Sequence, residues 1–503
     1  MLRPTFLGFR TATSGLKVNQ SVMDVIGQNM ANINTKGYTR QRLDTTSLGF
    51  NTSSIKFGPT GVVIGQGVQA NGTSQFRDAF LDIRYRTQAA KAGSEQVQTE
   101  ALGDLEKIMD EINTDKINEQ FSHLLQQLHS LTTNPSDPVM EGVVRTSAQM
   151  LTQMFNNYSN QINTVRDQQL DYLEDGAIVR VNQLMENIAK LNKQIRDDNL
   201  SGNPSLELND QRNLLIDELA DYVDIEVVTT PIDIGAGKTI DELSIVLRGQ
   251  GVELVNNDKK AEMSIKKPIG ETVELELKDA SGNPVADFNS KIKGGQIEGY
   301  LKFLNGKGEY ATTSDDFQDA KGVLYYRNML DTLANKFATE MNASNNGKAL
   351  FDAEGGGTIT AGNIKIAKDW LDSTGSYLVN TTSTAPGDDN TGATDNILKM
   401  IDLFDKEHTF ESSTAPLFEG KFQEFLTHTI TRLNLQKADT QTSYDTYAEA
   451  QFQLDYARSS MSSVDMNEEG VNLLQYSKSY NAASRLMTVL DDMLDTLINR
   501  MAV

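Results

Sequence analysis

Hydrophobic residues recur every seven positions at both ends of the chain. At the N-terminal end they are Leu2, Phe9, Leu16, Met23 and Met30. At the C-terminal end two such series run through residues 466–501 and include Leu473, Tyr476, Tyr480, Met487, Leu490, Leu494 and Leu497. This spacing is typical of helices that form coiled coils. Because a lone amphipathic helix cannot stably bury its stripe, we predict that these residues form an assembly interface; packing on the protein's own body is the alternative.

The middle of the chain predicts long helices joined by short breaks. No proline occurs between Pro138 and Pro204, and hydrophobic positions keep a helical spacing through that stretch. We expect either one helix of about 60 residues, which would be about 90 Å long, or two stacked helices broken near Gly176. Further helices are expected over residues 94–132, 210–223 and 316–343, and from residue 396 onward with a break around 408–418.

The spacing becomes strand-like after residue 225. Alternating hydrophobic and polar residues, separated by Gly, Asn and Pro turns, predict a small β-rich domain inserted between helices. Residues 344–394 are rich in Gly, Thr, Asn and Asp, which indicates a loop-rich surface module or a second small β unit. We therefore predict a multidomain α+β protein with terminal coiled-coil helices, a long helical bundle domain and inserted β-rich outer domains.

This organisation divides the chain into four parts. The predicted terminal coiled-coil assembly domain comprises residues 1–45 with 462–503. The predicted elongated helical domain comprises residues 46–224 with 296–343 and 395–461. The β-rich outer domain is expected at residues 225–295, and the loop-rich surface module at residues 344–394.

The net charge of the chain limits the classes of molecule that it is expected to bind. The chain of 503 residues carries a net charge of -23, with 46 Lys and Arg against 69 Asp and Glu. This excess of carboxylates argues against nucleic acid and against anionic membrane surfaces as partners. The two ends have opposite charge, because residues 1–45 hold six basic and two acidic side chains while residues 461–503 hold three and six. Opposite charge favours pairing of the ends, although individual surface ion pairs are weak.

Candidate chemistry is sparse. There is no cysteine, which excludes disulfides and thiol catalysis, and no apolar run long enough to span a membrane. GAGKT at residues 235–239 resembles half a phosphate-binding loop, but Ile232 stands where glycine is required. The four histidines, at positions 123, 129, 408 and 428, form no zinc-protease motif. We therefore expect no catalytic residues, no metal ligands and no cofactor, and a protein that is not an enzyme.

Short motifs at the two ends carry a resemblance to a known family. ANINTKGYTRQR, residues 31–42, resembles the N-terminal signature of flagellar axial proteins, and residues 464–501 resemble their shared C-terminal helix. The matching motif residues are Asn32, Asn34, Thr35, Gly37, Tyr38, Arg40 and Gln41. GYTRQ is similar to hook-associated proteins, and the helical tract 94–222 with residues 330–345 resembles the first of them, which forms the hook–filament junction. Gly470 and residues 345–415 depart from the family pattern.

The resemblance implies a structural subunit of the bacterial flagellum. Such proteins are exported unfolded by the flagellar type III pathway and act outside the cell, at the hook–filament junction. The implied partners are further copies of the chain in a helical array, the hook protein, the next hook-associated junction protein or the filament, the export machinery, and an export chaperone at the C-terminus. Neither nucleic acid nor membrane insertion is implied. The alternatives are a hook or rod subunit, or a secreted stalked adhesin or enzyme with activity in residues 225–415.

Overall fold

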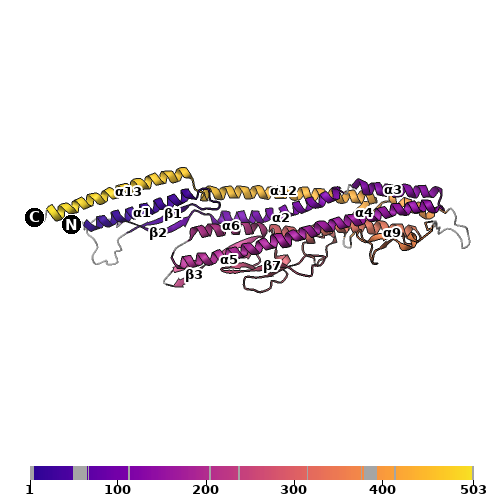
Figure 1. The fold of residues 1–503 in the computed structure, drawn as a ribbon, viewed down its shortest axis with the longest axis horizontal. Helices are drawn as coiled ribbons and strands as arrows, with labels where there is room; N and C mark the ends of the chain where they lie inside the picture. The colour runs from indigo at the N-terminus through magenta and orange to yellow at the C-terminus, as the bar shows by residue number, and fades with distance from the viewer. Residues whose placement is uncertain are drawn as a thin grey trace.

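The two ends of the chain lie together at one end of an elongated molecule. In the computed structural model, α1 (Thr5–Ala31) runs antiparallel to α13 (Met466–Asp495), and an antiparallel pair of strands, β1 (Gln41–Ser47) and β2 (Val68–Gln75), packs beside α1. These four elements form a narrow arm that projects from a thicker body (Figure 1). The structure describes residues 5–48, 65, 67–111, 114–202, 205–235, 238–313, 315–374, 377–378, 393–412 and 415–500.

Helix α13 begins where the sequence provides a cap. The Oδ1 atom of Asp465 accepts hydrogen bonds from the backbone N–H groups of Asn467 at 2.7 Å and Glu468 at 3.3 Å. A side-chain acceptor at this position satisfies N–H groups that have no partner inside the helix. The helix continues into a short π-helical end, η4 (Thr496–Arg500). The arm also contains β2, a segment that our division of the chain placed in the helical domain.

Long helices build the body. α2 (Ala79–Glu111) and α12 (Phe422–Ser462) lie side by side. The helix predicted over residues 94–132 is divided between α2 and α3 (Thr114–Thr133). The shorter helices are α6 (Leu206–Tyr222), α7 (Phe288–Lys291), α8 (Gly295–Asn305), η3 (Gly308–Tyr310), α9 (Val323–Ser344), α10 (Lys368–Leu371) and α11 (Asp395–Asp405).

One helical rod runs along the body. α4 (Pro138–Asp171) passes into a π-helical turn, η2 (Tyr172–Ile178), and then into α5 (Val179–Leu200). Asp137 caps the start by accepting a hydrogen bond from Val139 N–H at 2.8 Å, and Pro138 occupies a first-turn position where its missing N–H costs nothing. Of the two alternatives left open by the sequence, the structure has the continuous helix. The weak point expected near Gly176 is a π-helical turn that continues the rod.

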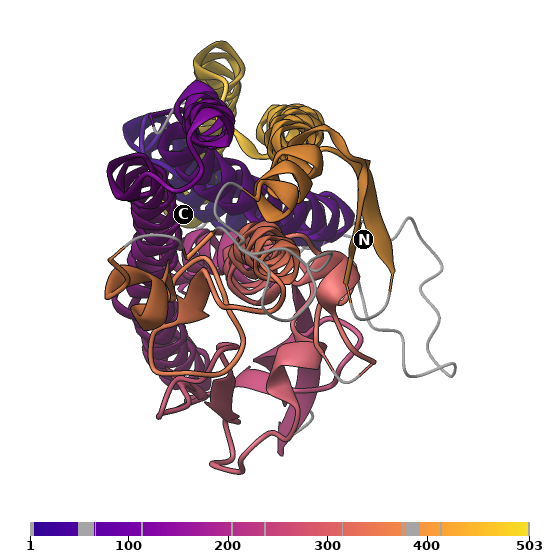
Figure 2. The same ribbon diagram turned by 90° about the vertical axis from the view of Figure 1, so that its right-hand side faces the viewer.

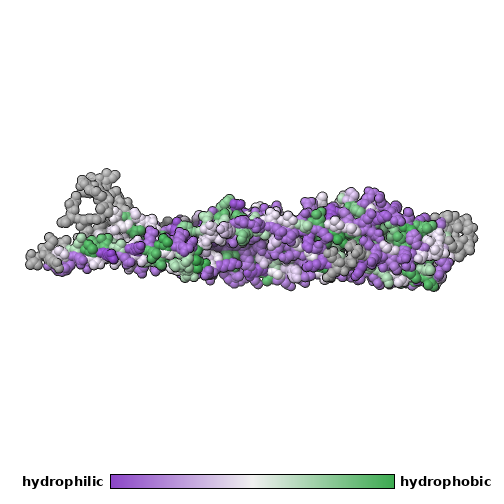
Figure 3. Space-filling view, turned by 90° about the horizontal axis from the view of Figure 1, so that it is seen from above, coloured by the Kyte–Doolittle hydropathy of each residue, from purple (hydrophilic) through white to green (hydrophobic). Residues whose placement is uncertain are grey.

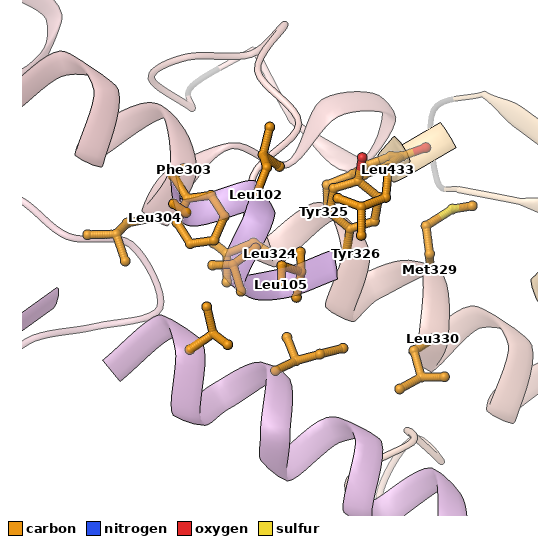
Figure 4. Packing of buried hydrophobic residues seen from close by; sticks show 14 of the residues in the cluster. Leu102, Leu105, Phe303, Leu304, Leu324, Tyr325, Tyr326, Met329, Leu330 and Leu433 are labelled. Atoms are coloured by element: carbon orange, nitrogen blue, oxygen red, sulfur yellow. The ribbon is translucent and has the colours of Figure 1, made fainter. Parts of the chain in front are cut away.

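The core runs through the body, and one part of it lies where α2, α8, α9 and α12 meet. Figure 4 shows Leu102 and Leu105 from α2 facing Phe303 and Leu304 from α8 and the side chains of α9. All of these residues are buried, as is Leu433 of α12. Apolar side chains at three- and four-residue spacing on each helix supply this core, because residues so spaced share one helix face.

The β-rich segment forms where alternation predicted it. β3 (Ile225–Gly235), β4 (Lys238–Leu247), β5 (Glu253–Asn256) and β6 (Lys259–Lys260) make an antiparallel sheet in that order, and β7 (Glu262–Ile265) pairs with β8 (Leu275–Lys278). These strands lie beside α5 and gather on one side of the helical body when the molecule is viewed end-on (Figure 2). The predicted multidomain α+β class is confirmed.

The described part of the loop-rich segment is anchored in the core. β9 (Phe351–Ala353) pairs with β10 (Ile364–Ile366), and Phe351, Ile364 and Trp370 are buried. The indole N–H of Trp370 donates to the carboxylate of the buried Glu141 at 3.2 Å. A second short hairpin, β11 (His408–Glu411) with β12 (Pro416–Gly420), precedes α12. These apolar residues attach the segment to the body, whereas its composition alone indicated a surface module.

Candidate functional site: the arm and its clasp

The C-terminal stripe faces α1 of the same chain. Tyr476, Tyr480, Met487, Leu490 and Leu494 are half-buried, as is Leu473, while most other side chains of α13 are exposed. The two helices approach closely at Gly8, where an added Cβ would lie 3.2 Å from both methyl carbons of Leu490. Thr13 Oγ1 is 3.8 Å from the sulfur of Met487. The two predicted stripes therefore meet within one molecule.

The N-terminal stripe is less deeply buried than its neighbours. Phe9, Leu16, Met23 and Met30 are half-buried, whereas the buried residues among those of α1 whose side chains are described are Ala12, Val18, Ile26 and Asn29. These buried residues do not follow the seven-residue spacing, because α1 is covered by the β1–β2 hairpin as well as by α13. Leu2 lies outside the described residues, and so does the side chain of Leu497. Contact of this stripe with other copies stays a prediction.

A second apolar stripe lies on the outer side of α13, and the sequence reading missed it. Five residues on the side away from α1 are between 46 and 64% exposed: Val471, Leu474, Leu486, Val489 and Met493. They form two groups, Val471 with Leu474 and Leu486 with Val489 and Met493, and residues 475–485 separate the groups. This interruption hid them beside the regular heptads. Hydrophobic residues gather along the arm in Figure 3, while most of the body is hydrophilic on this face. The arm therefore exposes apolar surface to its surroundings.

The family motif forms a clasp between the arm and the body. We use "clasp" for residues 29–41 together with their partners on α6 and at the start of α13. Its turn is closed by Thr35, whose N–H donates to Asn32 O at 2.9 Å and whose hydroxyl donates to Asn32 Oδ1 at 3.2 Å. Gly37 has φ +79°, and a Cβ there would lie 2.5 Å from the side chain of Leu214 on α6. Only glycine fits this position without strain.

Asn29 holds the clasp loop against α1. Its Oδ1 accepts hydrogen bonds from Tyr38 OH and from Gln41 N–H, both at 3.0 Å, and its Nδ2 donates to Gln41 O at 2.9 Å. Asn29 is 1% exposed, so water cannot replace these partners. Asn34, in contrast, is exposed and makes no side-chain hydrogen bond to a described residue.

Two carboxylates of α6 hold the clasp loop on the body. Asp210 Oδ2 accepts from Thr39 N–H at 2.9 Å, and Glu207 Oε1 accepts from Gln41 Nε2 at 3.1 Å. Burial raises the pKa of Asp210 above its ordinary value, although the hydrogen bond from Thr39 opposes this rise. Burial, with the nearby Glu207 and Asp210, raises the pKa of Tyr38 to about 12. The motif tyrosine is therefore a neutral hydrogen-bond donor.

Arg40 joins the clasp to α13. Its Nε donates to Glu469 at 2.7 Å and its Nη2 to Glu468 at 3.0 Å, and its backbone N–H donates to Ser462 O at 2.8 Å. Burial lowers the pKa of Arg40, but the hydrogen bonds and charges of Glu468 and Glu469 outweigh it, so that the pKa is raised. The Glu469 side chain is 2% exposed, which makes this a largely desolvated pair. Removing one partner of such a pair is far more costly than removing both.

A cavity of about 900 Å³ lies behind the clasp, between α2, α6 and the end of α12. Arg458 crosses it, pairing with Asp217 at 2.7 Å and Asp82 at 3.3 Å, and its guanidinium stacks on Tyr85 at 3.7 Å. Within the described residues, no cluster of carboxylates or histidines is arranged to hold a metal ion. The arrangement is suited to fastening one part of the chain to another.

The sequence predicted the motif residues of the clasp but not the residues that they contact. Tyr38, Arg40 and Gln41 were predicted as motif residues, and each makes a specific contact here. Their partners Asn29, Asp210, Glu207, Glu468 and Glu469 were not singled out as site residues. The signal that could have found them is charge, because a basic motif in an acidic chain requires specific acidic partners.

Comparisons with known proteins agree with this geometry. The family model described as the helical domain of the flagellar hook-associated protein FlgK matches residues 102–359. Two models of flagellar basal-body rod proteins match the arm, one at residues 9–39 and one, from the C-terminal region of FlgEFG, at residues 458–501. In the part of the chain that is described, no helix is both long and apolar enough to cross a membrane.

Individual flagellar proteins are also similar to this chain. Flagellar hook-associated protein 1 of Bacillus subtilis is 30% identical over 539 aligned positions, which cover 99% of both chains. The protein of that name from Salmonella typhimurium is 27% identical over 218 positions, covering 43% of this chain and 38% of the other. The solved structure of the flagellar hook junction protein FlgK from Burkholderia pseudomallei aligns with 19% identity and a TM-score of 0.42 over 54% of this chain and 44% of that one.

The paired terminal helices and the rod-protein matches at both ends define the class, that of flagellar axial structural proteins. Within that class the helical-domain match and the full-length relative decide the family. The chain belongs to the family of flagellar hook-associated protein 1.

Proposed function

We propose that this chain is a structural subunit at the junction between flagellar hook and filament, where copies of it assemble side by side through their arms. The observation that carries the proposal is the outer stripe of α13, which is apolar and unpartnered among the described residues. Its five side chains would each contribute about 1 kcal/mol if a neighbouring arm covered them. A contact repeated from copy to copy generates a helical array.

The further details rest on family membership. The chain leaves the cell through the flagellar export machinery, with an export chaperone at its C-terminus, and acts outside the cell. Its neighbours are the hook protein on one side and the next junction protein or the filament on the other. The role is structural and not catalytic, because the described side chains build a fastening and a bundle core.

The test compares two exposed residues of α13, one inside the outer stripe and one outside it. In a strain that lacks the gene, Val489→Asp should give a folded, exported protein that fails to attach filaments, because the carboxylate enters the contact between copies. Electron microscopy should then show hooks without filaments, and motility should be lost. Ser484→Asp, also exposed but beside no residue of the outer stripe, serves as the control and should restore motility.

Two results would contradict the proposal. Full motility with Leu474→Asp and Val489→Asp combined would show that the outer stripe takes no part in the assembly. Absence of hooks in the deletion strain would favour the alternative of a hook or rod subunit.

A further inference from the structure

The π-helical turn η2 forms one wall of a surface pocket that the proposed assembly does not use. The pocket has a volume of about 600 Å³ and lies between η2, the end of α6 and the start of α8. Its lining includes Tyr172, Tyr222, Tyr300, Asp171, Asp175 and Arg180. π-helical turns occur frequently at functional sites, because the widened turn displaces side chains from their helical positions.

Three tyrosines from three separate helical elements line the pocket. Tyr172 is 49% exposed, while Tyr222 and Tyr300 are half-buried. The hydroxyl of Tyr172 accepts a hydrogen bond from Gln168 at 2.8 Å, but those of Tyr222 and Tyr300 bond to no described residue. Burial raises the pKa of Tyr300 to about 12, so its ring is neutral and electron-rich. The faces of such rings attract cations.

The charges around the pocket are unbalanced. Arg180 is neutralised by Glu218, with Arg180 Nη2 2.6 Å from Glu218 Oε1. Asp171 and Asp175 are exposed, and neither makes an ion pair or a side-chain hydrogen bond to a described residue. Lys267, on the loop beside η2, is paired with Glu174 at 2.7 Å, and the charge of Asp175 also acts on it. The pocket therefore combines aromatic faces with two exposed carboxylates that make no direct ion pair with a described residue.

We propose that this pocket binds a basic side chain, arginine or lysine, presented by a partner protein. The carboxylates of Asp171 and Asp175 supply the charge that a guanidinium or ammonium group requires, and the tyrosine rings cover its apolar stem. Gly176 leaves the approach open, since an added Cβ there would meet no atom within 4 Å. A neutral or acidic side chain would gain nothing from this arrangement.

The test measures binding of a probe to the full-length chain. Tyrosines are labelled with ¹³C in the ring, the signals of Tyr172, Tyr222 and Tyr300 are assigned by Phe substitution, and N-acetyl-arginine amide is titrated. The three signals should shift together and saturate in the millimolar range, as expected for one exposed side chain. The corresponding citrulline amide, which has the same shape without the charge, should produce no saturable shift.

A pair of variants separates this site from adventitious binding. The double variant Asp171→Asn with Asp175→Asn should weaken binding roughly fivefold or more, the size expected when one or two such contacts are lost. Asp439→Asn, an exposed carboxylate on α12, should leave binding unchanged. Equal binding of the citrulline probe, or unchanged affinity in the correctly folded double variant, would overturn the proposal. Because no assembly is involved, the result is independent of the junction function.

Discussion

Single side chains at the clasp each hold two segments of the chain. Asn29 bonds to Tyr38 and to the backbone of Gln41, and Arg40 bonds to Glu468 and Glu469. An asparagine can donate and accept at once, and a guanidinium can donate from several nitrogens. The residues of the family motif are therefore determined by hydrogen-bond geometry at the joint between arm and body.

Gly37 should be the residue of the clasp least tolerant of substitution. Gly37→Ala would impose strain at φ +79° and bring a methyl group 2.5 Å from Leu214. We expect a loss of about 1–3 kcal/mol in the free energy of unfolding, measured by chemical denaturation. Gly27→Ala is the matched control, because an added Cβ at Gly27 meets no atom within 4 Å. In a helix interior that change should be neutral or stabilise by up to about 1 kcal/mol.

Asp210 should give the clasp a pH-dependent stability. Its pKa is raised, chiefly by burial, so protonation favours the folded state. The resulting stability is present below the ordinary aspartate pKa of about 4 and is lost as pH rises through the raised value. Asp210→Asn can still accept the hydrogen bond from Thr39 but cannot ionise. The stability of the wild type minus that of the variant should therefore decrease as pH rises through this range.

Denaturation of both proteins at a series of pH values measures that difference. Asp439→Asn on the exposed face of α12 provides the comparison and should track the wild type. A difference that grows with pH would show that the charged form of Asp210 is the one that stabilises the clasp.

At the scale of elements, α13 has two apolar faces, and one of them is covered by another helix of the chain. The regular heptad stripe meets α1 in the same chain, and the irregular outer stripe is exposed. Periodicity predicted that a helix would form and which face would be buried. It could not decide whether the covering helix belongs to the same chain, because intramolecular and intermolecular coiled coils share one spacing.

Leu490→Asp should open the arm and leave the body intact. The carboxylate would be placed against α1 at Gly8, where the helices are closest. We expect the pairing of α1 and α13 to lose about 1–3 kcal/mol. Deuterium exchange should become faster in residues 5–31 and 466–495 and remain unchanged in α9. Val489→Asp, one residue away on the exposed side, should leave exchange in the monomer unaltered; equal acceleration by both variants would contradict the assignment of the two faces.

At the scale of the whole molecule, stability is unevenly distributed. Glu469 is the one described residue of α13 that is fully buried, whereas α9 buries most of its side chains. Local opening requires less free energy where few apolar side chains are buried. Amides of the arm should therefore exchange before those of the body in the wild-type monomer. Exchange of α13 as slow as that of α9 would show that arm and body unfold together.

Sequence reasoning predicted the α+β class, helix through residues 138–204 and the inserted strands, because each rests on a regular spacing. It did not predict how the segment that carries Trp370 is attached to the core. Gly, Thr, Asn and Asp dominate residues 344–394, so the few apolar residues in this segment have no regular spacing from which a helix or strand could be predicted. Trp370 and Phe351 nevertheless attach this segment to the core, and Glu141 fixes the indole. Contacts between residues more than two hundred positions apart leave no local pattern.

The π-helical turn sets the rotation of one half of the rod relative to the other. Val165, Gln169, Leu173, Ala177 and Val181 are all buried at four-residue intervals. In an α-helix each interval overshoots a full turn by about 40°, so four intervals would carry the stripe about 160° around the axis. The wider π-helical turn absorbs this drift. Since β4, β5 and β6 pack on α5, the direction in which the β-rich part points from the body depends on the π-helical geometry of η2.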